Sequence, residues 1–418
     1  MDNKLCVVEG DDAKWKKVLQ EKIDSWKYDE KETAYYKRML RVLAMSDLSR
    51  REDHPIKIVI DKIIGADFYN WFTHVQIPEI VAEWETFDLF NFPKVHVARR
   101  ISDSYFVNKS DNVKESVLLR PHTSVMWYHY LKEGGGQEEL EKTGEVAALS
   151  WGKVYRVDEL DKSHHECFHQ IDGLRITAKD KEIINQDTLK NMLSNTIKAL
   201  FGDDVNFRFN EDQFPYTTDS LEVEVEFEGK WLELLGAWVV HPNVLEKLWL
   251  DPEKYNGWAF GFGIERLVMG IKKIPDIRIL WSDDPRITAQ WGNLDTYKEV
   301  SNFPPVFKDI SFFTEKTKFI LDEEASKKEW GIELTKESEA DLFEISGIIR
   351  DISWDAGDLI EEVKLIDIFE HEKFGDRKSV CIRITFRSLE RTLTNEEINV
   401  VYHAIRAKLE GDLGYELR

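Results

Sequence analysis

The 418-residue sequence has few cysteines, and their spacing excludes both a disulfide framework and a structural zinc site. It contains three, Cys6, Cys167 and Cys381, and none of them belongs to a Cys-x-x-Cys pair. Disulfide-rich folds and four-ligand zinc sites need more cysteines at short, regular spacings. A reducing compartment therefore fits best. We interpret Cys167 as an inert thiol, because no base stands beside it to activate it.

Long apolar stretches and targeting signals are also lacking. No run of about 18 uncharged apolar residues occurs, which excludes a membrane-spanning helix. The start, Met-Asp-Asn-Lys, has neither the apolar core of a signal peptide nor the Arg/Ser-rich, acid-poor character of a transit peptide. These absences predict a cytoplasmic location and no membrane contact, with a mitochondrial or plastid location as the alternative.

Basic residues are outnumbered: 57 Lys and Arg face 79 Asp and Glu, for a net charge of −22. Broad adhesion to nucleic acid needs clustered positive charge, so this balance excludes it. An RNA partner, if the protein has one, must be bound by a local basic patch rather than by the whole surface. The short basic patches at 14–17, 50–51 and 378–391 are interpreted as solvated surface when each is taken alone.

With 42% hydrophobic and 12% aromatic residues, the chain is predicted to fold into several globular units. Apolar positions three and four apart predict a helical N-terminal extension over 1–51, which ends at His54-Pro55. The main domain is predicted over 52–300. Ser-Asn-Phe-Pro-Pro at 301–305 interrupts the helical pattern, so a third unit is predicted over 301–418.

The main domain shows no alternation of strands and helices typical of a parallel sheet, which favours an α+β fold with an antiparallel sheet. Its clearest hairpin is the strictly alternating 221–227, a turn at 228–230 and a second strand over 231–236. We interpret the carboxylates at Glu222, Glu224 and Glu226 as solvent-facing rather than as a metal site. In the third unit, strands at 306–313, 363–369 and 379–386, helices at 337–352 and 395–409, and a final strand predict a ferredoxin-like βαββαβ order.

Two segments of the main domain carry arginines suited to a nucleotide. Arg156 ends a strand, and Phe168 opens the next, so a guanidinium on an α-phosphate can lie beside a ring stacked on a purine. His164 or His165 in the connecting loop can reach outer phosphates, although a surface hairpin with an arginine ion pair fits this segment equally well. Arg266 follows Gly261-Phe262-Gly263 in the first turn of a predicted helix, where anions are favoured. A dinucleotide fingerprint is the competing interpretation, and it is strongly disfavoured because Arg266 replaces its third glycine and no βαβ unit follows.

Taken together, these segments resemble a class II aminoacyl-tRNA synthetase, and more narrowly a phenylalanyl-tRNA synthetase of the single-chain, organellar type. The resemblance extends over 52–418. It rests on Leu119-Arg120-Pro121-His122-Thr123-Ser124, Val154-Tyr155-Arg156-Val157-Asp158, Phe168-His169-Gln170-Ile171-Asp172-Gly173, Phe214-Pro215-Tyr216-Thr217, Trp258-Ala259-Phe260-Gly261-Phe262-Gly263-Ile264-Glu265-Arg266 and Ile274-Pro275-Asp276-Ile277-Arg278. The segments 309–312, 383–387 and 390–393 look like the family's ferredoxin-like anticodon-binding domain.

The resemblance implies ligation of L-phenylalanine to tRNA(Phe) through a phenylalanyl-adenylate, with ATP and Mg²⁺, by a monomer without a separate editing domain. Catalysis would fall to Arg156 and Arg266. The implied ATP-binding residues are Arg156, His165, Phe168, Glu233 and Arg266, with Glu233 also holding the metal. The implied phenylalanine-binding residues are His122, Ser124, Gln170, Asp172, Phe214, Tyr216 and Ala259. The implied tRNA-binding residues are Arg383, Arg387 and Arg391, for which a salt-bridged strand face is an equally good interpretation.

Three positions depart from the family pattern. Asp172 stands where the family usually has glutamate, Tyr216 where it usually has phenylalanine, and Thr218 where bacterial relatives carry glutamate. The first shortens the reach to the substrate amine, and the first and third together leave the hold on magnesium open. A synthetase-like binding protein or a structural RNA-binding protein are the rival hypotheses. Intact Arg156, Gln170 and Arg266 favour the enzyme.

Overall fold

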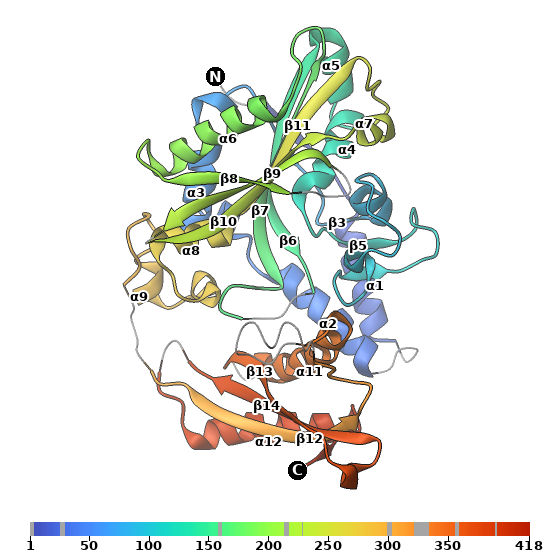
Figure 1. The fold of residues 1–418 in the computed structure, drawn as a ribbon, viewed down its shortest axis with the longest axis vertical. Helices are drawn as coiled ribbons and strands as arrows, with labels where there is room; N and C mark the ends of the chain where they lie inside the picture. The colour runs from blue at the N-terminus through green and yellow to red at the C-terminus, as the bar shows by residue number, and fades with distance from the viewer. Residues whose placement is uncertain are drawn as a thin grey trace.

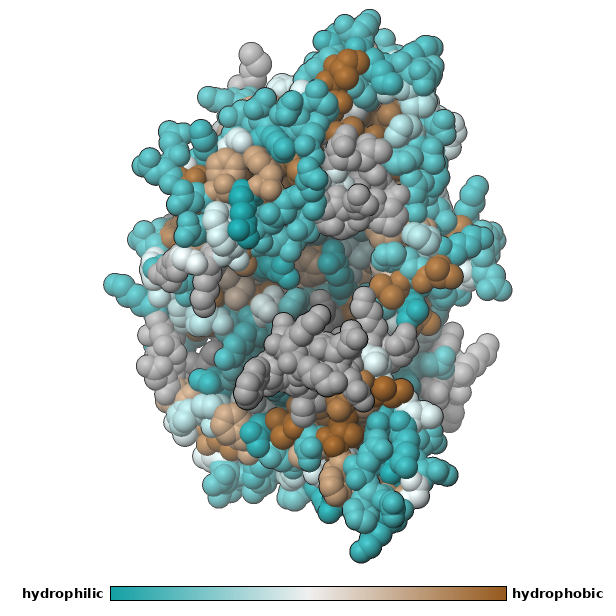
Figure 2. Space-filling model, viewed as in Figure 1, coloured by the Kyte–Doolittle hydropathy of each residue, from teal (hydrophilic) through white to brown (hydrophobic). Residues whose placement is uncertain are grey.

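The structure is a computed structural model that describes residues 4–25, 30–157, 161–212, 217–227, 229–298, 303–321, 334–355, 359–388 and 391–418. Figure 1 shows a large body built around one sheet and a smaller C-terminal body beside it. On the face shown in Figure 2 the surface is mainly hydrophilic, and its hydrophobic residues gather only in small groups.

An eight-stranded sheet organises the large body, in the order β1-β2-β6-β7-β11-β10-β9-β8. Its strands are β1 (Leu5–Val7), β2 (Thr73–Gln76), β6 (Glu145–Tyr155), β7 (Cys167–Ala178), β8 (Phe207–Asp212), β9 (Thr217–Phe227), β10 (Lys230–Val240) and β11 (Tyr255–Gly263). From β6 to β8 every pairing is antiparallel, whereas β1 and β2 add to the edge in parallel. A small second sheet contains β3 (Ile80–Ala82), β5 (Val117–Leu119) and β4 (Phe106–Asn108). The predicted α+β class is confirmed.

Helices cover both faces of this sheet, because successive strand residues point to opposite sides. One face packs against α3 (Pro55–Ile64), α6 (Gln186–Phe201) and α8 (Ile264–Lys272), and the other against α4 (Met126–Lys132), α5 (Gly136–Thr143) and α7 (Pro242–Lys247). Figure 1 shows the two groups on opposite sides of the strands. The shorter elements are η1 (Leu48–Arg50), η2 (Asp67–Tyr69), η3 (Trp84–Asp88), η4 (Val97–Arg99), η5 (Thr123–Val125), η6 (Ile277–Trp281) and α9 (Pro285–Thr288).

The N-terminal region forms two helices, α1 (Asp12–Ile23) and α2 (Glu30–Ala44), rather than one long helix. The backbone N–H of Asp24 bonds the carbonyl of Gln20 and closes α1. Apolar side chains of α1 and α2, including Leu19 and Met39, are buried in one cluster with Tyr105 and Tyr155. The region is therefore packed against the strand that leads to Arg156.

The C-terminal body contains β12 (Val306–Glu315), α11 (Lys336–Asp355), β13 (Ile360–Phe369), η7 (Glu372–Phe374), β14 (Arg377–Phe386), α12 (Asn395–Gly411) and β15 (Glu416–Leu417). Its sheet has the order β13-β14-β12-β15, and buried residues of α11 and α12 pack with it in one core. This is the predicted ferredoxin-like βαββαβ arrangement, which is confirmed.

A partly buried cluster of charges joins the three parts of the chain. On α2, Arg38 and Arg41 each bond Asp351 of α11 at 3.0 Å, and Arg41 also bonds Glu166, in the loop before β7, at 3.0 Å. Tyr105 donates its hydroxyl proton to Glu166 at 2.6 Å. Burial would raise the pKa of Glu166, but the nearby arginines lower it below its usual value. Figure 1 shows α2 beside α11 where the two bodies meet.

Candidate active site

Three neighbouring strands bring the predicted segments together. In the β6–β7 pairing Phe168 lies opposite Val154 and Asp172 opposite Ser150, and in the β7–β11 pairing Gln170 lies opposite Gly263. Residues two apart on a strand share a face, so Phe168, Gln170 and Asp172 project from the same side of the sheet.

Both predicted arginines lie at the end of this strand group where β6 and β11 finish. The Arg156 guanidinium lies 5.1 Å from the centre of the Phe168 ring, and its Nε donates to the carbonyl of Pro121 at 3.3 Å. Arg266, in the first turn of α8, has its Nη2 3.4 Å from Nε2 of His164, in the loop that follows Arg156. Both side chains are exposed. Arg156 therefore precedes the loop whose His164 contacts Arg266.

His165, which the sequence assigns to ATP, points into the protein instead. Its ring stacks on Trp281 at 5.3 Å, and its Nδ1 lies 3.1 Å from the backbone nitrogen of Cys167. Burial lowers the pKa of His165 to about 4, which keeps it neutral. The structure therefore corrects this assignment: of the two adjacent histidines, His164 is the one beside Arg266, a choice that loop sequence cannot make.

Polar side chains gather around Asp172, and we call His122, Ser124, Ser150, Gln170 and Asp172 the Asp172 cluster. Ser124 donates to Oδ2 of Asp172 at 2.6 Å. Burial raises the pKa of Asp172 to about 6, although the hydroxyls of Ser124 and Thr123 and the charge of Arg156 oppose the shift. Below about pH 6 this carboxyl is therefore mainly protonated.

His122 is held as a neutral hydrogen-bond acceptor. Its Nε2 lies 3.2 Å from the carbonyl of Thr86, which can only accept, so the ring proton is assigned to Nε2. Burial, together with the charge of Arg156, lowers the pKa of His122 to about 4. The ring also meets Phe90 edge to face at 5.4 Å. The free lone pair is then on Nδ1.

Three buried atoms of the Asp172 cluster have no hydrogen-bond partner within the described part of the chain: Nδ1 of His122, Oγ of Ser150 and Oε1 of Gln170. Buried polar groups are paired in most proteins, so a concentration of unpaired acceptors indicates a place for a polar ligand. Sequence reasoning missed Ser150. The alternation along β6, which places it on the Asp172 face, was the available signal.

Small residues on β11 make room beside this cluster. A methyl group at Gly261 would lie 2.6 Å from Oδ1 of Asp172, so only glycine leaves that carboxylate in place. Ala259 is fully buried on the same face of the strand, opposite Leu174. The predicted aromatic residues Phe214 and Tyr216 lie outside the described residues.

The predicted metal ligand Glu233 is exposed on β10, at a bulge opposite Glu224. No group of three or more His, Cys, Asp or Glu side chains placed to hold a metal occurs in the described residues. Mg²⁺ at nucleotide sites is usually held by one or two carboxylates together with phosphate oxygens, and one exposed carboxylate fits that mode. Glu224 is ion-paired with Arg208, and Glu226 accepts from Asn206, so neither side chain is a bare solvent-facing carboxylate.

The three arginines assigned to tRNA are all engaged in ion pairs. Arg383 bonds both carboxylate oxygens of Asp309 at 2.8 Å. Arg387 pairs with Glu361, which also bonds Lys162 in the loop after Arg156. Arg391 pairs with Glu397 near the start of α12 at 2.7 Å. The alternative interpretation, a salt-bridged face, therefore describes their state in this structure.

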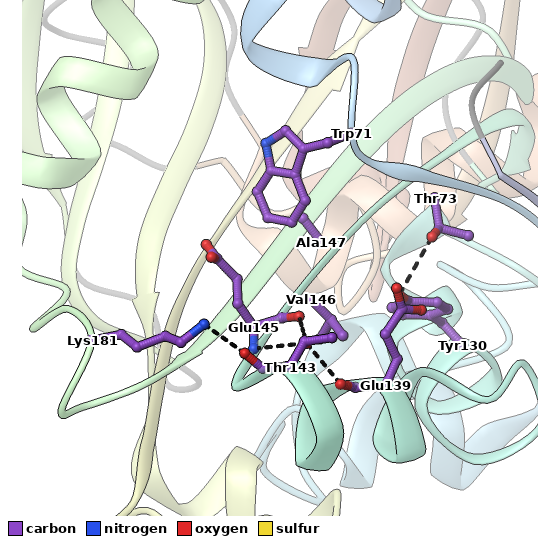
Figure 3. A pocket seen from close by; sticks show the side chains of 9 residues that line it. All are labelled: Trp71, Thr73, Tyr130, Glu139, Thr143, Glu145, Val146, Ala147 and Lys181. Carbon is purple, nitrogen blue, oxygen red and sulfur yellow. Dashed lines mark hydrogen bonds between the residues drawn. The ribbon is translucent and has the colours of Figure 1, made fainter. Parts of the chain in front are cut away.

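A separate cavity of about 230 Å³ opens at the other end of β6 (Figure 3). It is lined by Trp71, Thr73, Tyr130, Glu139, Thr143, Glu145, Val146, Ala147 and Lys181. Lys181 donates to the carbonyl of Thr143. Because β6 runs from Glu145 to Tyr155, this cavity lies almost the whole strand away from Arg156.

Two family matches cover most of the chain. The family described as "tRNA synthetases class II core domain (F)" matches residues 42–291, and the "Ferredoxin-fold anticodon binding domain" matches residues 301–418. The chain therefore belongs to the class II aminoacyl-tRNA synthetases.

Similar proteins show which family within this class the chain belongs to. A phenylalanine–tRNA ligase of Arabidopsis thaliana, named chloroplastic/mitochondrial, is 35% identical over 386 residues, which is 89% of this chain and 80% of the relative. The mitochondrial ligase of Dictyostelium discoideum is 31% identical over 89% of this chain and 86% of its own. The alpha subunit from Acaryochloris marina is 38% identical but matches 57% of this chain. Within its class, the chain belongs to the phenylalanine–tRNA ligase family.

The predicted cytoplasmic location is wrong. The relatives that match along nearly the whole chain are named mitochondrial or chloroplastic/mitochondrial, from plant, slime mould and mouse alike. The prediction used the lack of long apolar runs and the first residues of the sequence, whereas this likeness extends over both matched domains. Among the described residues, no helix is long and apolar enough to cross a membrane.

Proposed function

We propose that this chain joins L-phenylalanine to tRNA(Phe) in an organelle, through a phenylalanyl-adenylate formed from ATP. The observation that carries the proposal is the meeting of Arg156 and Arg266 at one loop, beside a cluster of buried acceptors around Asp172. The first group suits phosphates, and the second suits the ammonium group of an amino acid.

In the first step, a carboxylate oxygen of phenylalanine attacks the α-phosphorus of ATP. The bond between the α-phosphorus and the bridging oxygen breaks, and pyrophosphate leaves. Arg156 binds the α-phosphate, where negative charge grows, and Phe168 stacks on the adenine. Arg266, with His164, holds the outer phosphates. Mg²⁺, when bound, neutralises phosphate charge, and Glu233 is the residue that would hold it.

The Asp172 cluster binds the amino acid by its charged end. The Asp172 carboxylate, fixed by Ser124, pairs with the ammonium group, while neutral His122 and Gln170 offer further acceptors. Ala259 is small enough to leave space for the phenyl ring, and Phe214 and Tyr216 are the aromatic residues that the family resemblance assigns to it. A tyrosine hydroxyl without a partner there costs about 1 to 3 kcal/mol. We propose further that the chain does not edit tyrosine; the stretch between the two matched domains, residues 292–300, is too short for an editing module.

The C-terminal domain recognises tRNA. Phe307 is half exposed and lies 5.6 Å from the Arg383 guanidinium, an arrangement suited to stacking an unpaired base. The second step passes the phenylalanyl group to the terminal ribose of tRNA and releases AMP. We propose that one chain performs both steps as a monomer.

The test is amino-acid-dependent exchange of labelled pyrophosphate into ATP, measured with all twenty amino acids and followed by charging of tRNA(Phe). We expect exchange with phenylalanine at least ten times faster than with tyrosine at equal concentration. Exchange with none of the twenty would overturn the proposal and leave a synthetase-like binding protein.

A further inference from the structure

Ser150 has a buried hydroxyl group that has no role in the proposed adenylate-forming reaction. It lies directly opposite Asp172 across the β6–β7 pairing. Side chains directly opposite in an antiparallel pair have Cβ atoms roughly 4.5 to 5.5 Å apart on the same face. Ser150 is fully buried, and its Oγ has no hydrogen-bond partner among the described residues. A hydroxyl in that state is costly unless a ligand completes it.

In this structure the carboxylate of Asp172 is engaged elsewhere and does not bond this hydroxyl. Oδ2 of Asp172 is fixed by Ser124 at 2.6 Å, and Oδ1 lies against the backbone of Gly261. Asp172 is also one methylene, about 1.5 Å, shorter than the glutamate usual at this position in the family. In the proposed binding mode the shorter side chain lengthens the distance between the carboxylate and the substrate amine, and Ser150 is the residue directly opposite Asp172 on the neighbouring strand.

The chemistry of an ammonium group explains why the acceptors are arranged this way. It has three N–H donors and no acceptor, so a complete site needs three acceptors and no competing cation. Asp172 supplies one of them, and the unpaired Nδ1 of His122 or Oε1 of Gln170 supplies another. The Ser150 hydroxyl oxygen supplies the third.

We propose that Ser150 binds the substrate: its Oγ accepts a hydrogen bond from the α-ammonium group of the amino acid, beside Asp172. The inference rests on the proposed function, since it assigns one more contact within the same site. Ser150 and Asp172 act as a pair, in which the hydroxyl restores the reach that the shorter carboxylate loses.

The first test is Ser150→Ala in phenylalanine-dependent pyrophosphate exchange. The KM for phenylalanine rises roughly 5- to 20-fold, and the KM for ATP does not change. Inhibition by 3-phenylpropanoate, which has the ring and carboxylate but no ammonium group, stays the same. The matched control is Ser346→Ala on α11, which also removes a buried hydroxyl without a partner among the described residues and leaves both KM values unchanged. If Ser150→Ala folds poorly by circular dichroism, Ser150→Cys keeps the volume but is a weak acceptor, and gives the same result.

The second test asks whether Ser150 and Asp172 share one space. Asp172→Glu alone raises the KM for phenylalanine, because the added methylene meets the Ser150 side chain. Ser150→Gly with Asp172→Glu recovers most of that loss, so the two effects do not add. A KM for phenylalanine that Ser150→Ala and Ser150→Cys both leave unchanged, or strictly additive effects, would overturn the inference. Failure of the proposed function is a different result, because the wild-type chain would then show no phenylalanine-dependent exchange.

Discussion

The Asp172 cluster and the C-terminal arginines place polar groups in opposite states. Around Asp172, three buried acceptors have no partner in the described structure, and the neutral His122 adds no competing positive charge. In the C-terminal domain, each of Arg383, Arg387 and Arg391 is already matched with a carboxylate. The first region has unmet hydrogen-bonding capacity, and the second has little.

This difference shows which residues are prepared for a ligand. A buried atom without a partner costs free energy that a ligand can recover, whereas an arginine in an ion pair must first lose its carboxylate. Residue types alone predicted a binding site equally well at the Asp172 cluster and at the C-terminal arginines. We therefore expect large effects from substitutions near Asp172 and at the two arginines proposed to bind phosphate, and small effects from substitutions of the C-terminal arginines.

The largest effect is expected for Arg266→Ala. Loss of a guanidinium that meets the outer phosphates lowers the rate of phenylalanine-dependent pyrophosphate exchange roughly 10²- to 10³-fold. Arg377→Ala is the matched control, because Arg377 is also exposed and its partner is Glu416 on the C-terminal surface. Exchange at the wild-type rate in Arg266→Ala would contradict the proposed role.

A smaller effect is expected for Asp172→Asn, which should change both the KM for phenylalanine and the pH dependence of that KM. The KM for phenylalanine rises roughly ten- to a hundredfold, because a neutral amide cannot pair with the ammonium group. In the wild type the same KM rises as the pH falls through about 6, where Asp172 becomes protonated, and the variant lacks this dependence.

Asp172→Asn should weaken phenylalanine binding but increase the stability of the fold. The pKa of Asp172 is raised in the folded state, so its ionised form costs folding free energy above about pH 6. Asp172→Asn removes this cost and stabilises the protein at pH 7.5 by roughly 1 to 3 kcal/mol, measured by urea unfolding. A less stable variant with an unchanged KM would show that Asp172 is purely structural.

His169 gives a pH-dependent stability of intermediate size. Its ring lies 2.6 Å from Glu265 and 3.3 Å from Asp47. Burial would lower its pKa, but these carboxylates raise it to about 9. The charged ring therefore stabilises the fold below about pH 6.5, and this contribution is lost as the pH rises through about 9.

The measurement is thermal unfolding between pH 6 and pH 10. His169→Gln is less stable than the wild type by roughly 1 to 3 kcal/mol at pH 6.5, and the gap closes toward pH 10. His403→Gln, at an exposed position on α12, serves as the control and follows the wild type. If the difference in stability between His169→Gln and the wild type is constant across this pH range, titration of His169 is excluded as its cause.

The smallest effect is expected for Arg383→Ala. Because Asp309 already neutralises this guanidinium, we expect the KM for tRNA in aminoacylation to rise no more than about threefold, with exchange unaffected. Asp309→Ala frees the guanidinium for phosphate and lowers that KM. A tenfold loss in Arg383→Ala would show that RNA displaces Asp309, and would remove the contrast between the two regions.

Sequence patterns predicted the elements that depend on local periodicity. The hairpin of β9 and β10, the βαββαβ order of the C-terminal domain, and the placing of Arg156 and Phe168 around one strand-loop-strand hairpin follow from alternation and turn residues. The family resemblance supplied the residues of the Asp172 cluster other than Ser150.

Features that depend on distant partners were not predictable. Nothing local distinguishes His164 from His165, since only the packing of Trp281 turns one of them inward. The partners of Arg383 and Arg387 come from other strands, and β1 joins the sheet through its pairing with β2. The unpaired state of Ser150 is a property of its surroundings, which no single-sequence pattern records.

The charge cluster at α2 limits what a truncation experiment can reveal. Removing the C-terminal domain would take Asp351 from both Arg38 and Arg41, two largely buried cations that also face Glu166. The backbone carbonyl of Glu166 accepts the N–H of Arg156 at 3.1 Å. Loss of adenylate synthesis in such a fragment would thus reflect a displaced Arg156. Point substitutions are the better way to separate adenylate synthesis from tRNA charging.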